Sequence, residues 1–187
     1  MSTQRIILGI DPGTTVMGYG LIRTCDDRHA DLLALGALEL HRLEDHYAKL
    51  KLIFNRTISL IEHFQPSELA IEAPFYGKNV QSMLKLGRAQ GTAIAAALSR
   101  SLDIYEYAPR KIKLSITGRG NASKEQVALM LQSMFRIEKM PENLDATDGL
   151  AAAVCHFYQK NPAQVNTANV TEKSWKAFIA NHPARVK

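Results

Sequence analysis

The stretch Arg5-Ile-Ile-Leu-Gly-Ile-Asp-Pro-Gly13 decides how the fold begins. Its apolar run, Ile6 to Ile10, is continuous, which is typical of a strand that is buried on both faces. Asp11 ends the run, and the adjacent Pro12 and Gly13 favour a tight turn. The next segment, 16–24, is rich in β-forming residues, so we expect it to return beside the first strand as its antiparallel partner.

The sequence beyond this hairpin predicts a third strand and then helices that alternate with two more strands. Apolar residues at helical spacing indicate the helices, and Pro66 ends the first of them. The expected elements are strands at 30–40, 68–72 and 104–108 and helices at 45–64, at 80–102, from Pro109, after Ser123 and at 144–158. This order predicts an α/β fold with a mixed five-stranded sheet, three antiparallel N-terminal strands plus two parallel ones, flanked by helices.

Length and composition indicate one folded domain followed by a polar tail. The chain has 187 residues with an ordinary share of hydrophobic side chains, which is enough to bury a core. We assign residues 1–160 to this domain and 161–187 to the tail, where Trp175, Phe178 and Ile179 would share one face of a short helix. The formal net charge of +5 is compatible with a polyanionic partner.

Cysteine content and hydropathy indicate where the protein works. Cys25 and Cys155 cannot form a disulfide framework, which favours a reducing compartment. The run from Ile6 to Ile10 is too short for the apolar region of a signal peptide. The longest uncharged, mainly apolar stretch, 91–99, is far shorter than a membrane span of about 20 residues. We therefore expect a cytoplasmic protein that has no membrane partner.

Four acidic residues lie where predicted elements begin or end. Asp11 ends the first strand, Glu72 ends the fourth, and Asp145 and Asp148 lie three apart on one face of the last helix. If the two strands are neighbours, these carboxylates converge at one sheet edge and repel each other unless a cation compensates. Mg²⁺ or Mn²⁺ suits such oxygen ligands. Each acid alone also has a structural alternative, as a hydrogen-bond acceptor in a turn or a partner of the helix dipole.

Segments in one consistent order, from about Arg5 to Tyr158, carry a resemblance to a known family. These segments are Ile7-Leu-Gly-Ile-Asp-Pro-Gly13, Gly18-Tyr-Gly20, Ala70-Ile-Glu72, Phe75, Lys78-Asn79, Lys85-Leu-Gly87, Gly91, Glu106-Tyr107, Lys113, Gly118, Gly120, Lys124 and Asp145-Ala-Thr-Asp148. Together they resemble the RuvC family of Holliday-junction resolvases, within the ribonuclease H-like superfamily. Asp-Pro-Gly alone would be a weak signal, whereas the joint match is highly specific.

The resemblance implies a DNA endonuclease that resolves Holliday junctions, which are four-way DNA junctions, in recombination and repair. It implies symmetric, metal-dependent nicking of two strands that leaves 5′-phosphate and 3′-hydroxyl ends, with two Mg²⁺ ions per active site and Mn²⁺ as a substitute. It also implies a homodimer and association with the RuvA–RuvB branch-migration complex. The implied residues are the metal-binding and catalytic acids Asp11, Glu72, Asp145 and Asp148, the catalytic lysines Lys113 and Lys124, and an aromatic wedge at Phe75.

Basic and aromatic residues near these acids suggest a surface for DNA. Aromatic rings can stack on an unpaired base while neighbouring cations contact phosphates. The candidate DNA-binding residues are Phe75, Tyr76, Lys78, Asn79, Lys85, Arg88, Lys111 and Arg119. The alternatives are aromatic rings that cover the core and an ordinary solvated face.

Small residues recur every four positions on the long helix, at Gly87, Gly91 and Ala95. Such spacing lets a second backbone come close, and the resemblance implies that this backbone is the same helix of a second copy. The alternative is close packing on the chain's own sheet.

Two other functions compete with the nuclease interpretation. Asp11-Pro-Gly-Thr-Thr15 is similar to the phosphate-binding turn of sugar kinases and chaperone-type ATPases, but those proteins close two lobes over a nucleotide and this chain has the length of one. A protein that binds junctions without cutting them is the third possibility, and the presence of all four acids argues against it.

Overall fold

The computed structural model of the chain describes residues 4–74, 79–141 and 143–160. Its sheet has five strands in the order β3-β2-β1-β4-β5. Strands β1, β2 and β3 are antiparallel, whereas β4 lies parallel to both β1 and β5. The strands are β1 (Ile6–Asp11), β2 (Val16–Thr24), β3 (Ala30–Glu39), β4 (Glu68–Glu72) and β5 (Asp103–Tyr107), and the helices are α1 (His46–Phe64), α2 (Val80–Leu98), α3 (Pro109–Thr117), α4 (Lys124–Phe135) and α5 (Asp145–Lys160). The predicted mixed sheet is confirmed.

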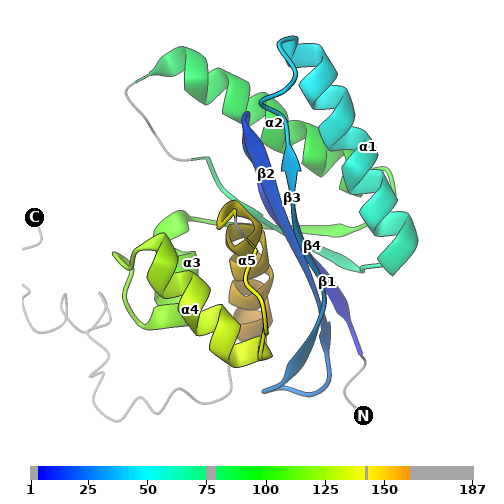
Figure 1. Ribbon diagram of the computed structural model, residues 1–187. Helices are drawn as coiled ribbons and strands as arrows, with labels where there is room; N and C mark the ends of the chain where they lie inside the picture. The colour runs from blue at the N-terminus through cyan, green and yellow to red at the C-terminus, as the bar shows by residue number, and fades with distance from the viewer. Residues whose placement is uncertain (1–3, 75–78, 142, 161–187) are drawn as a thin grey trace, which may run out of the picture.

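Helices cover both faces of the sheet and divide the core in two (Figure 1). One face packs against α5, with α3 and α4 outside it, and the other packs against α1 and α2. The central strand β1 is buried on both faces, since Ile7 and Leu8 belong to different core clusters and neither is exposed to solvent. Among the helices of the described ranges, none is long and apolar enough to cross a bilayer.

Helix α5 packs on β1 and β2 at glycine positions. A Cβ atom at Gly20 would lie 2.5 Å from the Cα of Leu150, and one at Gly149 would lie 2.5 Å from the Cα of Tyr19. A Cβ at Gly9 would collide with the carbonyl oxygen of Gly149. Helix and sheet backbones are therefore in direct contact, and no larger residue fits between them.

A buried polar network ties the C-terminal half of α5 to β4 and β5. His156, with no exposed surface, has Nδ1 2.6 Å from the Tyr107 hydroxyl and Nε2 3.0 Å from Glu68 Oε2. Lys160 Nζ donates to Glu68 Oε1 at 2.6 Å. Burial alone would raise the pKa of Glu68, but the hydrogen bonds from His156 and Lys160 and the charge of Arg5 outweigh it and lower this pKa to about 2. Glu68 therefore stays ionised and holds the helix in place.

The long helix is shorter than the sequence predicts. Its apolar spacing continues to Leu102, but α2 ends at Leu98. Ser101 adopts a positive φ of 60°, which reverses the chain, and Leu102 enters the core with 5% of its surface exposed. The prediction of a helix over 80–102 is wrong because Leu102 owes its apolar character to the core and not to a helix face.

Replacing Gly149 by Ala is expected to lower the free energy of unfolding by about 1–3 kcal/mol, because the added methyl group meets the backbone of β2. Chemical denaturation measures this loss. The matched control is Gln159→Ala on the exposed end of the same helix, expected to change stability by less than about 0.5 kcal/mol. Equal stability of the two variants would contradict the direct contact between α5 and the sheet.

Candidate active site

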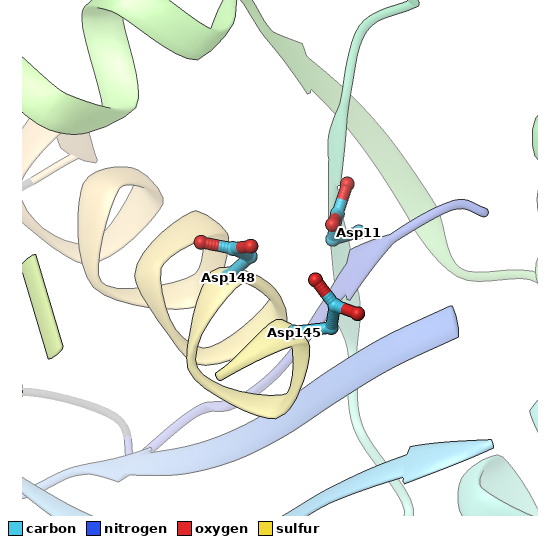
Figure 2. Close-up of side chains that lie close together, drawn as sticks. All are labelled: Asp11, Asp145 and Asp148. Carbon is cyan, nitrogen blue, oxygen red and sulfur yellow. The ribbon is translucent and has the colours of Figure 1, made fainter. Parts of the chain in front are cut away.

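Three aspartates meet where β1 ends and α5 begins (Figure 2). One carboxylate oxygen from each of Asp11, Asp145 and Asp148 lies within 4.8 Å of those of the other two. The strand presents Asp11, whereas Asp145 and Asp148 come from the first turn of the helix. The glycine contact of α5 with β1 and β2 brings these two segments, far apart in the chain, to one place.

Glu72 lines the same pocket as Asp11 and Asp148, although it lies outside the tight group of three. The parallel pairing of β1 with β4 explains this position, since the carboxyl ends of both strands meet at one sheet edge. The pocket is open, measures about 250 Å³ and is completed by Lys113 and Lys124. Its remaining wall consists of Pro109, Ile112, Val127 and Ala151.

Burial and mutual repulsion disfavour the charged forms of these acids. Burial, followed by the charges of Glu72 and Asp148, raises the pKa of Asp11 well above its usual range. Burial and the charge of Asp148 raise the pKa of Glu72 to about 7. Burial also raises the pKa of Asp148, although Lys124 works against it. Without added positive charge, the cluster therefore takes up protons near neutral pH.

Lys124 supplies part of the missing positive charge. Its Nζ donates to Asp145 Oδ1 at 2.8 Å and to Asp148 Oδ2 at 2.6 Å. Burial alone would lower the pKa of Lys124, but the two hydrogen bonds outweigh it and raise this pKa. The capping box of Ser123 and Gln126 orients the first turn of α4 that carries the lysine.

The donor set fits a hard divalent cation. The acids offer only carboxylate oxygens, which Mg²⁺ and Mn²⁺ prefer, and the repulsion between carboxylates, which adds to burial in raising the pKa values of Asp11 and Glu72, favours an added cation. The open pocket also leaves room for water and for phosphate oxygens beside the acids.

The candidate DNA-binding residues are distributed around this pocket and on α2. Lys85 and Arg88 are exposed on α2, and Arg119 is exposed in the loop after α3. Lys111 lies over the ring of Tyr107, with Nζ 5.2 Å from the ring centroid. Asn79 is the N-cap residue of α2, since its Oδ1 accepts a hydrogen bond from Ser82 N at 3.1 Å. Phe75, Tyr76 and Lys78 lie outside the described residues.

Gln90 is a residue near the site that the sequence analysis missed. Its side chain is buried, and its Nε2 donates to Glu106 Oε2 at 2.7 Å and to the backbone oxygen of Glu72 at 3.4 Å. It thereby joins α2 to the end of the strand that presents Glu72. A glutamine among the alanines that face the sheet was the available signal, because a buried amide needs partners.

The small residues of α2 do not pack on the chain's own sheet. The helix contacts the sheet side through Ala89, Ala93, Ala96 and Ala97, all buried. Gly91 and Ala95 are exposed, and a Cβ at Gly87 or Gly91 would meet nothing within 4 Å. Leu84 and Leu98 extend this outward stripe and are 59% and 57% exposed.

Comparison with known proteins gives one consistent result. The family model described as "Crossover junction endodeoxyribonuclease RuvC" matches residues 7–156. A protein with that description from Christiangramia forsetii is 57% identical over 187 residues, covering 100% of this chain and 95% of the relative. A second, from Bacteroides fragilis, is 59% identical over 189 residues, covering 98% of this chain and 97% of the relative. The solved structure of T. thermophilus RuvC in complex with Holliday junction substrate has a TM-score of 0.78 and 28% identity, covering 84% of this chain and 96% of that chain.

Divalent cations are expected to bind more tightly as the pH rises through 7. Protons compete for Glu72, whose pKa is about 7, so the affinity for Mn²⁺ should be at least about tenfold lower at pH 6 than at pH 8. Calorimetric titration with Mn²⁺ at the two pH values measures this ratio. Glu138→Gln, a change of an exposed acid outside the pocket, should leave the ratio unchanged. Equal affinities at both pH values would contradict the proton competition.

Proposed function

Because the chain belongs to the RuvC family of crossover junction endodeoxyribonucleases, we propose that it resolves four-way DNA junctions by nicking two strands symmetrically. The observation that supports this most is the open pocket lined by Asp11, Glu72, Asp148 and two lysines, with Asp145 close to Asp11 and Asp148. We extend the proposal to association with the RuvA–RuvB branch-migration complex, on the family resemblance alone.

We assign the metal-binding role to the four acids. Asp11 lies at the end of β1, Glu72 at the end of the neighbouring strand β4, and Asp145 and Asp148 in the first turn of α5. Two Mg²⁺ ions bound there would supply an activated water and a counter-charge for the departing 3′ oxygen, which leaves 5′-phosphate and 3′-hydroxyl ends. The buried floor of β1 and α5 keeps these acids in place while the open side admits the DNA backbone.

We assign charge neutralisation at the phosphate to Lys113 and Lys124. Lys113 is half-buried and lines the pocket that a phosphate would enter. Lys124 keeps about half of its side chain exposed while it holds Asp145 and Asp148, so it is accessible to a phosphate as well. The exposed cations Lys85, Arg88, Lys111 and Arg119 would contact phosphates farther along the strands.

A homodimer fits both the substrate and the surface of α2. The described residues of the chain hold one group of acids that could bind metal, whereas resolution of a junction requires cuts in two strands. The outward stripe of Leu84, Gly87, Gly91, Ala95 and Leu98 is apolar and small, so the same stripe of a second copy can approach closely. We therefore propose that two copies pair through α2.

Removing a carboxylate should abolish nicking and spare binding. Asp11→Asn, Glu72→Gln and Asp148→Asn are each expected to lower the nicking rate by about 1,000-fold or more, since each removes part of the charge that holds metal. A synthetic four-way junction with Mg²⁺ measures the rate, a gel shift measures binding, and ligase sealing of the products tests for 5′-phosphate ends. Asp27→Asn in the exposed turn after β2 is the control. Retained nicking in one variant would remove that residue from the site, and ATP hydrolysis by the wild type would favour the kinase-like alternative.

Phe75→Ala is expected to slow nicking of an intact junction more than it weakens binding. Stacking on an opened base is worth about 1–3 kcal/mol, which corresponds to a loss of about 5- to 150-fold in the single-turnover rate. Phe75→Trp should keep the rate, because stacking needs only an aromatic face. A large drop in melting temperature with an unchanged rate would show that Phe75 serves the core instead.

Gly91→Arg is expected to separate the dimer. An unpaired charge buried at a close helix contact costs about 3 kcal/mol or more, which raises the dimer Kd by about 100-fold. Sedimentation equilibrium of the 20.8 kDa chain measures this change. Ser82→Arg, an exposed position on the other side of α2, is the control. A monomeric wild type, or dimers of equal strength in both variants, would contradict pairing through this stripe.

A further inference from the structure

A second pocket lies far from the acids, against the last turns of α5. It measures about 160 Å³ and opens between the end of α4, the C-terminal half of α5 and the turn between β2 and β3. Its lining residues are Arg28, His29, Ala30, Met134, Phe135, Val154, Phe157 and Tyr158. A cavity of about 150 Å³ is large enough to hold benzene, so the volume of this pocket, which Arg28 and His29 line on its polar side, suits one aromatic ring.

Part of the surface beside this pocket is apolar. Met134 lines the pocket and is 37% exposed, and Met130, one helical turn earlier on α4, is 43% exposed. Residues four apart share a helix face, so the two methionines form a continuous apolar strip that leads into the pocket. Methionine side chains adapt to aromatic rings and contact them favourably.

The chain itself provides a matching segment. Tyr158 lines the pocket, α5 ends two residues later at Lys160, and the tail of residues 161–187 begins at this point. In the tail, Trp175, Phe178 and Ile179 have the i, i+3, i+4 spacing of one helix face. Asn169 and Glu172, three apart before this cluster, have the pattern of a helix start.

We propose that the tail folds back onto its own domain and that Trp175, Phe178 and Ile179 dock on the pocket and on the strip of Met130 and Met134. The connection over 161–174 is easily long enough, because extended chain spans about 3.3 Å per residue. Tethering through so short a connection gives an effective concentration of the order of millimolar, so even a weak contact stays occupied.

This docking site is separate from the site of cutting. Asp145 and Asp148 occupy the first turn of α5, close to Asp11, whereas the second pocket involves Val154, Phe157 and Tyr158 near the other end of this helix. The docked tail covers apolar surface and supports the junction of α4 and α5 without entering the pocket of Asp11 and Glu72. The inference stands independently of the proposed function.

Trp175 is the one tryptophan of the sequence, so its fluorescence reports directly on the tail. The experiment measures its emission maximum and its quenching by acrylamide in the full-length chain. In the wild type we expect a blue-shifted emission and a quenching constant below that of the urea-unfolded chain. Met134→Lys should raise the quenching constant to the unfolded value. Leu129→Lys, on the same helix, 63% exposed and outside this pocket, should leave it unchanged.

A second variant tests the proposal even if Met134→Lys does not fold. Phe178→Asp changes only the tail and should release Trp175 in the same way, with an unchanged far-ultraviolet spectrum of the domain. An emission of the wild type equal to that of the unfolded chain would overturn the proposal. So would a response to Leu129→Lys, a protection that depends on protein concentration and thus indicates a second copy, or a protection that develops only with added junction DNA.

Discussion

The direct backbone contact of α5 with β1 and β2 is the constraint on which the remaining structure depends. Gly9, Gly20 and Gly149 bring the helix so close to the sheet that no side chain fits between them. Because helix and strand are rigid, this contact also sets where Asp145 and Asp148 stand relative to Asp11. Glu68 and His156 hold the other half of the helix to β4 and β5. The position of the acids thus follows from packing between elements and not from a flexible loop.

The same contact brings carboxylates that repel each other together at the carboxyl end of β1. Three acids, Asp11, Glu72 and Asp148, line one pocket, and Asp145 lies close to two of them. The pKa values of Asp11 and Glu72 are raised most by burial and then by other carboxylates. Lys124 donates hydrogen bonds to Asp145 and Asp148, and its charge offsets only part of what raises the pKa values of Asp11 and Glu72. Such a site favours whatever adds positive charge, whether protons or divalent cations.

The three proposed functions occupy different parts of one small domain. Asp145 and Asp148 lie in the first turn of α5, the proposed docking site of the tail lies at its last turns, and the proposed pairing surface is the outward stripe of α2. Gln90 connects two of these regions, since it stands on α2 and donates to the backbone of Glu72 and to Glu106. Pairing through α2 would therefore place a second copy against the helix whose Gln90 donates a hydrogen bond to the backbone of Glu72.

The sequence by itself determined the elements and the identity of the acids. Local patterns can be recognised in a sequence without knowledge of the fold. Here they are a continuous apolar run before Asp11, another before Glu72 and a helix cap before Lys124. Only the tertiary structure decided that α2 ends at Leu98, that Gln90 contacts Glu72 and that Gly87 and Gly91 face outward. The reason is physical: an apolar or small residue fits a helix face, a core and an interface equally well, and only the packing of distant segments selects among them.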